Sequence, residues 1–585
     1  MRATFFGLEI GKTGLTTAQF GLDVTGHNIS NLDTDGYTRQ RIVSTAYDPF
    51  ATIGKFAPVG QGLVGGGVRV QILDQIRSAY LDRRFRTENT AYSYWEQRTQ
   101  SLTYIQSFFD NVNEKTSINY SMSAFFESMK SVSHDPVSGA PRTLMQTAAM
   151  DLVQQLNMIY DGLIDFQKVE NRAVETKIGD INRMAVDLAE LNKAIYGFEI
   201  TGMIANDLRD KRNLLVDELS RYIDIEYREY PDQFGHSLFE VKIAGVKLVD
   251  HDRINRLDIF YETNVLGEDE ERRAMPVWAH LEISHPLARV DMNRITGGEL
   301  KAHIDMRDGP GYTVDNRDKG IPYYIEMMNN LARALVLEVN NQHIQGWSDH
   351  PDGSKTNILF FESLGLMDPD DPTEPLNLQR YIRYYDEDGV DITGTMVPPP
   401  WDPAFDESIY DDVIATKSFE PPDSILSQIT AKSIILSQAI QDSAYNIAAS
   451  SAEIGRPVNL GDSVELQRGN NVNMNSLYDL FRKTGITIYG DTILQRDIGS
   501  FDDYGTTIRF DVGITLNSAK QIGETSRILT LAANNQRTSV AGVSLDEEMV
   551  GLVKYNHAYN GAARVITAMD DALDRLINGT GRVGL

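Results

Sequence analysis

The chain has 585 residues, more than one ordinary domain contains, so we expect roughly three or four domains. Its 55 Lys and Arg against 83 Asp and Glu give a formal charge of −28, which repels phosphate backbones and argues against a nucleic-acid partner. Cysteine is absent, which excludes disulfides, thiol catalysis and thiolate metal sites. The sequence also lacks any apolar run of about 18 residues, the length that a membrane helix needs, and so predicts no membrane association.

The first 32 residues predict a helix with an apolar seam, meaning the heptad positions a and d along one face. Large residues occupy position a and mostly small ones position d: Leu8, Leu15, Leu22 and Ile29, then Gly11, Ala18, Thr25 and Leu32. Small d residues allow a partner helix to approach closely. Because Glu9 and Lys12 interrupt what would be the apolar stretch of a secretory signal, we expect no cleaved signal peptide.

Further helices are predicted between the two ends of the chain. Apolar residues recur there at helical spacing in five segments: 86–112, 146–200, 205–222, 321–343 and 502–538. Such stripes are typical of the core of a helix bundle.

Two segments differ from this helical pattern. Residues 223–295 alternate apolar and polar side chains in short runs, which predicts strands. Residues 366–423 hold 15 acidic side chains, three basic ones and nine of the 20 prolines. This composition predicts a loop-rich excursion at the surface, and it accounts for 12 of the 28 net negative charges.

The other end of the chain predicts a second heptad helix that begins after Ser544 and stops at Gly579. Its a and d positions are Leu545, Leu552, Tyr559, Ile566 and Leu573, then Glu548, Tyr555, Ala562, Met569 and Leu576. All of them except Glu548 are suited to burial. The two matching patterns indicate that the chain ends pair with each other. Two interpretations remain open: an intramolecular coiled coil that packs on the body, or a stalk that is completed only when subunits assemble.

Three fragments resemble ligand-binding motifs, but each lacks a feature that its motif requires. Gly60–Gly65 matches the glycine motif of a dinucleotide-binding loop. A strand with alternating apolar and polar residues follows it, however, where the motif requires a helix. Gly7–Thr13 has three residues between its glycines where a phosphate loop needs four. Asp386–Asp391 lacks the glutamate that closes a calcium loop. Since no histidine cluster or nucleophile elbow is present either, we predict no enzyme and no catalytic, cofactor-binding or metal residue.

The residues that follow the first helix, Asn28–Gln40, resemble the N-terminal signature of the bacterial flagellar rod, hook and hook-associated proteins. Within that family, the run Gly36-Tyr37-Thr38-Arg39-Gln40 is most similar to the proteins of the junction between hook and filament. The C-terminal stretch Gly542–Tyr559 is similar to that family's ending. The resemblance covers roughly residues 1–225, 296–360 and 456–585. Asp35 stands where axial proteins often have proline, so the turn after the first helix is expected to be less rigid here.

The resemblance, together with the patterns above, predicts a mainly α fold with β insertions, an α+β multidomain protein. Paired terminal coiled-coil helices (1–45 with 541–585) would line a tube, and a long-helix bundle body would comprise 46–225, 296–360 and 456–540. Residues 226–295 would form a β-rich inserted domain, and 361–455 an acidic, proline-rich variable insertion on the outer surface.

The resemblance also implies a structural subunit of the flagellum that is exported through the flagellar type III apparatus without a cleaved signal. Its location would be extracellular, at the hook–filament junction. The implied partners are other copies of the chain in a ring or helical array, the hook protein, the second junction protein and a cytoplasmic export chaperone, with no nucleic acid and no membrane.

We expect both chain ends to form the assembly interface. Its N-terminal residues are Leu8, Leu15, Leu22, Asn28, Ile29, Asn31, Gly36, Tyr37, Arg39 and Gln40. Its C-terminal residues, which the chaperone would share, are Leu545, Met549, Leu552, Tyr555, Tyr559, Ile566, Met569 and Leu573. The alternatives are another axial protein, such as hook protein or the second junction protein, and a secreted adhesin-like protein with a binding module at 226–295 or 361–455.

Overall fold

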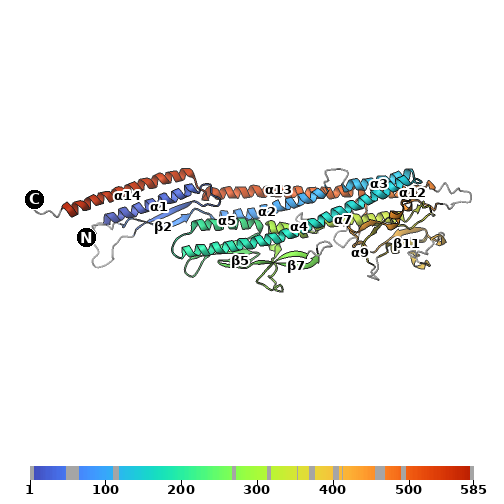
Figure 1. Ribbon diagram of the computed structural model, residues 1–585, viewed down its shortest axis with the longest axis horizontal. Helices are drawn as coiled ribbons and strands as arrows, with labels where there is room; N and C mark the ends of the chain where they lie inside the picture. Colours follow the sequence, from blue (N-terminus) through green and yellow to red (C-terminus); the bar gives the residue numbers. More distant parts are fainter. Residues whose placement is uncertain are drawn as a thin grey trace.

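The computed structural model describes residues 6–47, 65–109, 117–265, 272–311, 318–351, 353–367, 376–398, 407–410, 413–454, 468–488, 496–497 and 499–579. The molecule is elongated, and both chain ends lie at the same extremity (Figure 1). There α1 (Phe6–Ser30) and α14 (Leu545–Gly579) lie side by side and project beyond the rest of the chain. We call these two helices the terminal helix pair.

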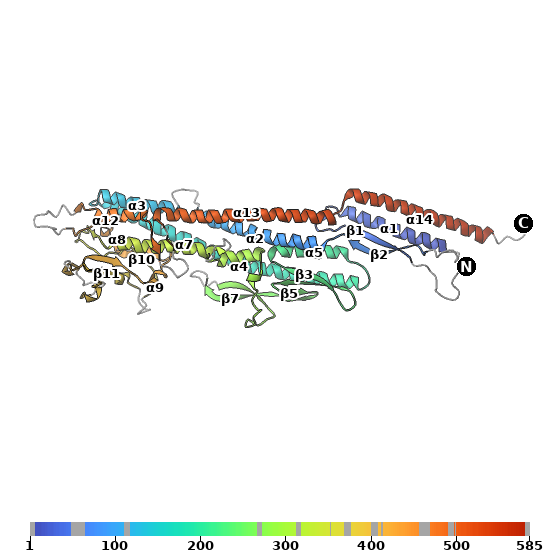
Figure 2. The same ribbon diagram turned by 180° about the vertical axis from the view of Figure 1, so that it is seen from behind.

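Long helices run along the remaining length of the molecule (Figure 2). They are α2 (Ala79–Phe109), α3 (Ile118–His134), α4 (Gly139–Glu199), α5 (Asn206–Tyr222) and α13 (Phe501–Ala541). With 61 residues, α4 extends about 90 Å at 1.5 Å per residue. Side-chain caps help to begin two of these helices: Ser117 accepts a hydrogen bond from the Tyr120 amide, and Ser500 accepts one from the Asp503 amide. The helix-rich body predicted from the apolar stripes is therefore present.

Shorter helices complete the body. They are α6 (Glu299–Asp308), α7 (Ile321–Ala334), a π turn (Leu335–Val339), α8 (Asn340–His343), α9 (Asp423–Leu426), α10 (Gln438–Asp442) and α12 (Val472–Asp479). The segment predicted as one helix over 321–343 is thus continuous in the structure but changes its hydrogen-bond pattern over Leu335–Val339.

All strand pairs are antiparallel. Strands β3 (Glu226–Pro231), β4 (Ser237–Ile243), β5 (Val246–Asp250) and β6 (Arg253–Ile254) form one sheet in that order. Strands β7 (Leu257–Val265) and β8 (Arg272–Trp278) form a hairpin beside it, so the strands predicted over 223–295 are present. Strands β1 (Gln40–Ala46) and β2 (Val68–Gln75) pair next to the terminal helices, with a register shift between Val43 and Ser44.

The remaining strands are short and form four pairs. They are β9 (Trp347–Ser348) with β14 (Ala448–Ser450), β10 (Phe361–Ser363) with β13 (Ile434–Leu436), β11 (Ile382–Tyr385) with β12 (Thr416–Phe419), and β15 (Thr487–Ile488) with β16 (Arg496–Asp497).

Within the described ranges, the body has two hydrophobic cores that divide α4 between them. The larger core joins the first half of α4 to α2, α3, α7 and α13. The second joins the other half of α4 to α5, α6 and the strands β4, β5, β7 and β8. The region 226–295 therefore shares its core with two long helices, since Val241, Val249 and Trp278 belong to the same cluster as Val174 and Ile181.

The segment 361–455, predicted as a variable insertion on the outer surface, shares a core with the body. Leu378, Tyr384, Phe419 and Ile434 are buried and belong to the larger core. Strand β13 also pairs with β10, and the Phe361 carbonyl of β10 accepts a hydrogen bond from Asn340 on α8 at 2.8 Å. The acidic and proline-rich composition concealed these apolar residues, because average composition does not report how a few large side chains are placed. Part of the acidic segment, 368–375 and 399–406, lies outside the described residues.

Candidate assembly interface

The terminal helix pair is antiparallel and held in register by a ladder of small residues. Gly7 lies against Met569, Gly14 against Ala562 and Gly21 against Tyr555, so each step of seven along α1 matches a step of seven back along α14. A Cβ added to Gly21 would lie 2.5 Å from Tyr555 Cδ1. This close approach is possible because glycine has no side chain at the point of contact.

The same seven-residue spacing continues from Gly21 to a polar pair. Asn28 and Glu548 follow the glycine ladder in register, and the Asn28 side-chain amide donates to Glu548 Oε2 at 3.1 Å. Both side chains are buried. Glu548, the one seam residue that the heptad pattern marked as unsuitable for burial, is thus the most deeply buried residue of the α14 seam.

Hydrogen bonds from a charged donor explain how the Glu548 carboxylate can be buried at this position. Arg39 Nε donates to Glu548 Oε1 at 2.7 Å, and Arg39 Nη1 forms an ion pair with Glu547. Burial by itself would lower the pKa of Arg39, but these two carboxylates outweigh it and raise the pKa. A buried carboxylate with charged hydrogen-bond partners costs far less than an unpaired one.

The signature residues after α1 extend this network to the body. Asn28 Oδ1 accepts from the Tyr37 hydroxyl at 2.8 Å and from the Gln40 amide at 3.1 Å. Gln40 Nε2 donates to Asp207 at 2.9 Å, and the Thr38 amide donates to Asp210 at 2.9 Å, which ties β1 to α5. We call the set Asn28, Tyr37, Thr38, Arg39, Gln40, Asp207, Asp210 and Glu548 the polar joint.

Burial governs the protonation of the polar joint. It raises the pKa of Tyr37, and the neighbouring Asp207, Asp210 and Glu548 raise it further, so the Tyr37 hydroxyl remains a donor. Burial also raises the pKa of Asp210, although the hydrogen bonds from Thr38 oppose this shift. The predicted N-terminal signature is therefore a connector within one chain, between the terminal helix pair and the body.

The other predicted interface residues lie on the terminal helix pair or at the following turn. Half-buried positions are Leu8, Leu15, Leu22, Ile29, Asn31, Leu552, Tyr555, Tyr559, Ile566, Met569 and Leu573. Leu545 and Met549 are exposed, as is Gly36, which has a positive φ of 76° in the turn that leads to Tyr37. The glycine ladder and the acceptor role of Glu548 were not predicted, although the spacing Gly7, Gly14, Gly21, Asn28 is visible in the sequence.

The rejected motifs have structural explanations where they are described. Gly7–Thr13 lies inside α1, and β2 follows the glycines of 60–65, of which 60–64 fall outside the described residues. Asp386 accepts hydrogen bonds from the amides of Asp388 and Val390 in a turn. Over the described ranges, no three His, Asp or Glu side chains are grouped to hold a metal ion, and no helix has the length and apolarity to cross a membrane.

Comparisons with known proteins agree with this architecture. Residues 102–361 match the family model "Flagellar hook-associated protein FlgK helical domain", residues 8–38 match "Flagella basal body rod protein", and residues 535–579 match "Flagellar basal body rod FlgEFG protein C-terminal". Flagellar hook-associated protein 1 of Bacillus subtilis is 24% identical over 99% of both chains. The Salmonella typhimurium protein of that name is 23% identical over 97% of this chain and 98% of its own.

A solved structure shares the fold. The flagellar hook junction protein FlgK from Burkholderia pseudomallei matches with a TM-score of 0.50 at 14% identity, over 79% of this chain and 100% of the other. The separate matches at the two ends and in the helical body, together with the full-length relatives, agree on one assignment. The chain is therefore similar over its whole length to proteins named flagellar hook-associated protein 1, and its helical body and two ends match models of flagellar protein families.

Proposed function

We propose that the chain is the subunit that joins the flagellar hook to the filament and polymerises through its terminal helices. The relatives are structural flagellar proteins, and the named solved neighbour is a hook junction protein. A structural role also fits the long helices that run along the body.

The observation that carries this proposal is the uncovered surface of α14. Its seam faces α1, but apolar side chains on its other faces remain exposed: Met549, Val550, Val553, Val565 and Ile577. The seam residues Leu545 and Leu576, near the two ends of the helix, are exposed as well. Val550 and Ile577 expose 69% and 63% of their surface. A soluble helix normally keeps such faces polar, so this pattern favours burial against further subunits.

The two interpretations of the paired ends can thus be combined. The seam is filled within one chain, and the outer faces of α14 would be covered when copies assemble around a tube. The hook protein would contact one end of this assembly and the second junction protein the other. Before assembly, an export chaperone would cover the same apolar faces of α14, and the subunit would leave the cell through the flagellar type III apparatus.

Charge substitutions at an apolar and at a polar exposed position of α14 test the proposal. Val553→Asp places a charge on an uncovered face, whereas Asn556→Asp places the same charge three residues away at an exposed polar position. Each variant would replace the wild-type gene in a deletion strain, and hooks and filaments would be counted by electron microscopy. We expect Val553→Asp to give hooks without filaments and Asn556→Asp to give normal filaments.

The monomers provide the control for folding. Val553→Asp should show the wild-type circular dichroism and thermal unfolding, because 51% of the Val553 surface is already exposed in the monomer. Leu552→Asp, in the seam, should instead release α1 from α14 in the monomer as well as block assembly. Normal filaments with Val553→Asp, or a deletion strain with intact filaments, would refute the proposed role.

A further inference from the structure

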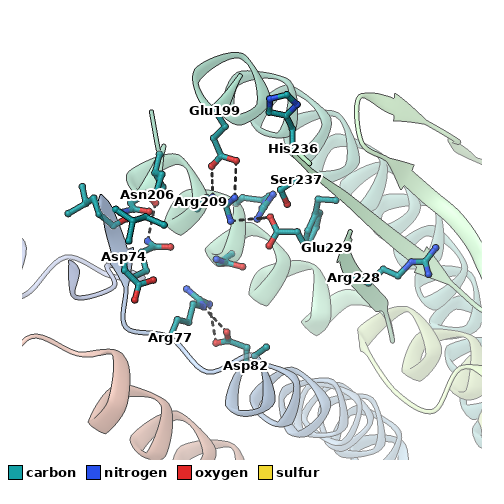
Figure 3. A pocket seen from close by; sticks show the side chains of 18 of the residues that line it. Asp74, Arg77, Asp82, Glu199, Asn206, Arg209, Arg228, Glu229, His236 and Ser237 are labelled. Atoms are coloured by element: carbon teal, nitrogen blue, oxygen red, sulfur yellow. Dashed lines mark hydrogen bonds and ion pairs between the residues drawn. The ribbon is translucent and has the colours of Figure 1, made fainter. Parts of the chain in front are cut away.

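A cavity of about 770 Å³ lies where the body meets the β1–β2 pair. Its walls come from the start of α2, the ends of α4 and β2, the helix α5 and the strands β3 and β4 (Figure 3). The volume is in the range of pockets that hold an organic ligand or a short peptide segment, and exceeds what a single ion needs. Neither the glycine ladder nor the outer faces of α14 contribute to it.

Arginine dominates the chemistry of this cavity. Arg83 and Arg86 lie three residues apart on α2, and Arg209 and Arg212 lie three residues apart on α5, so each pair shares one helix face. Arg86 stacks on the ring of Tyr227 and Arg212 on that of Phe239, each with 4.2 Å between the guanidinium carbon and the ring centre. Stacking of this kind fixes the guanidinium planes, and fixed planes favour recognition of planar anions.

The acidic groups of the cavity are already bound to arginine. Glu199 accepts from Arg209 Nε at 2.6 Å, and Glu229 accepts from both Arg209 and Arg212 (Figure 3). Asp82 accepts from Arg77 Nε at 2.6 Å. These carboxylates therefore have little capacity left for further cations.

Donors in the cavity wall remain unused. Arg83 is exposed and has no hydrogen bond or ion pair to any part of the chain that the structure describes. Arg86 and Arg212 are 97% and 96% buried, yet Arg86 Nη1, Arg212 Nε and the Tyr227 hydroxyl find no acceptor among the described residues. These three atoms have almost no accessible surface, so an acceptor in the cavity reaches Arg83 directly and the other donors only as their side chains shift. Such a shift is favoured because an unsatisfied buried donor costs about 1–3 kcal/mol.

We propose that this cavity is a carboxylate-binding site. A carboxylate is planar and accepts hydrogen bonds from two guanidinium donors at once, which matches the arginine pairs of α2 and α5. Six arginines and four acidic residues line the cavity, so its formal charge is +2 in a chain whose total is −28. The exposed side chains of Ile72 and Met203 in its wall suit the methylene groups that accompany a carboxylate in an acidic peptide.

The ligand is most simply an acidic side chain presented by a protein partner, because the size of the cavity accommodates several residues. A free dicarboxylate has the same chemistry, and the experiment separates the two sources. This inference does not depend on the role of α14, since the two sites share no residue.

The test uses the full-length monomer and calorimetric titration at low and physiological salt. Three probes are compared: a pentaglutamate peptide with blocked ends, succinate and inorganic phosphate. The peptide should bind, and more weakly as salt screens the charges. Arg83→Gln and Tyr227→Phe should each weaken binding by roughly 5- to 10-fold, the effect of about one lost hydrogen bond.

Two matched variants on the same elements serve as controls. Arg84 points elsewhere and donates to Gln536 at 3.0 Å, and the Tyr230 hydroxyl donates to Asp250 at 3.1 Å. Arg84→Gln and Tyr230→Phe should therefore bind as the wild type does. Tyr227→Phe removes a hydroxyl that has no acceptor, so the variant should fold with undiminished thermal stability.

Each outcome decides the proposal. Peptide binding that depends on Arg83 supports a protein partner as the source, and succinate binding without peptide binding supports a free carboxylate. Absence of binding by the peptide and by succinate at millimolar concentration, binding of phosphate alone, or equal binding by Arg83→Gln would each overturn it.

Discussion

Asn28 on α1 donates a hydrogen bond of 3.1 Å to Glu548 on α14, and both side chains are buried. This contact lies at the base of the terminal helix pair, where the two helices meet the body. It continues the seven-residue register of the glycine ladder with a polar pair. The change from apolar to polar contact defines the position at which the projecting helices are attached.

Replacement of Asn28 should loosen that attachment. Its side chain makes four hydrogen bonds, with Tyr37, the backbone of Gln40 twice, and Glu548. Asn28→Ala leaves these groups buried without partners and should cost about 2–4 kcal/mol. Hydrogen exchange in α1 should speed up accordingly. Asn31→Ala is the control, since Asn31 bonds only to neighbours on its own helix and loop, and an equal effect of both variants would contradict the assigned role.

Two glycines of α1 provide a matched pair for the helix contact. Gly21→Ala forces a methyl group against the Tyr555 ring, which should cost about 1–3 kcal/mol as the ring or helix shifts. Gly26→Ala places the same methyl where nothing lies within 4 Å, so only the gain in helix propensity, about 1 kcal/mol, should appear. Thermal unfolding of the terminal helix pair, followed by hydrogen exchange, should shift in opposite directions. Equal shifts would show that the close approach is not present in solution.

His343 predicts a loss of stability in acid. The Nδ1 atom lies 2.6 Å from the Ile358 carbonyl oxygen, and Nε2 accepts from the Ala448 amide at 2.9 Å, an arrangement that only the neutral ring with a proton on Nδ1 satisfies. Burial lowers the pKa of His343 from its ordinary value of 6.5 to about 4.

Because the unfolded chain binds this proton first, the stabilisation by His343 is complete above pH 6.5 and is lost as the pH falls towards 4. The free energy of unfolding should therefore drop by roughly 3 kcal/mol more in the wild type than in His343→Gln over this range. Urea unfolding at several pH values measures the difference. The control is His134→Gln, at an exposed position in the last turn of α3, and a wild-type curve parallel to that of His343→Gln would argue against a buried neutral ring.

Arg333 on α7 should determine whether the segment 423–436 stays on the core. Its guanidinium donates to the carbonyl oxygens of Leu426 and Ile429 from Nε, at 3.0 and 3.1 Å, and to that of Ser427 from Nη2 at 2.9 Å. Arg333→Gln cannot reach all three and should cost about 2–4 kcal/mol, because buried carbonyl groups lose their partners.

Hydrogen exchange of residues 423–436 should then rise well above that of the rest of the body. Lys432→Met removes a partly exposed ion pair with Asp161 in the same segment and should change little. Unchanged protection in Arg333→Gln would support the sequence-based expectation of a surface insertion.

The sequence by itself determined the body helices α2, α4, α5 and α13 and the pairing of the chain ends, whereas α3 was not predicted. Heptad spacing depends only on the order of residues along one chain, and the long helices α2, α4 and α13 were predicted for the same reason. The strands between β3 and β8 were also predicted, because alternation is a local pattern. The family resemblance rested on similarly local runs, above all Asn28–Gln40.

Only the tertiary structure decided what those runs contact. Glu548 violated the apolar pattern, and its burial depends on Arg39 and Asn28, which are more than 500 residues away in the sequence. The apolar residues of 376–455 reach the core through strand pairs and through Arg333, which composition does not reveal. The arginine pairs of α2 and α5 likewise could not be recognised as one site from the sequence, because only the folded chain places them around one cavity. Periodic patterns report which face of an element is buried, whereas the partner of a buried charge is a property of the assembled chain.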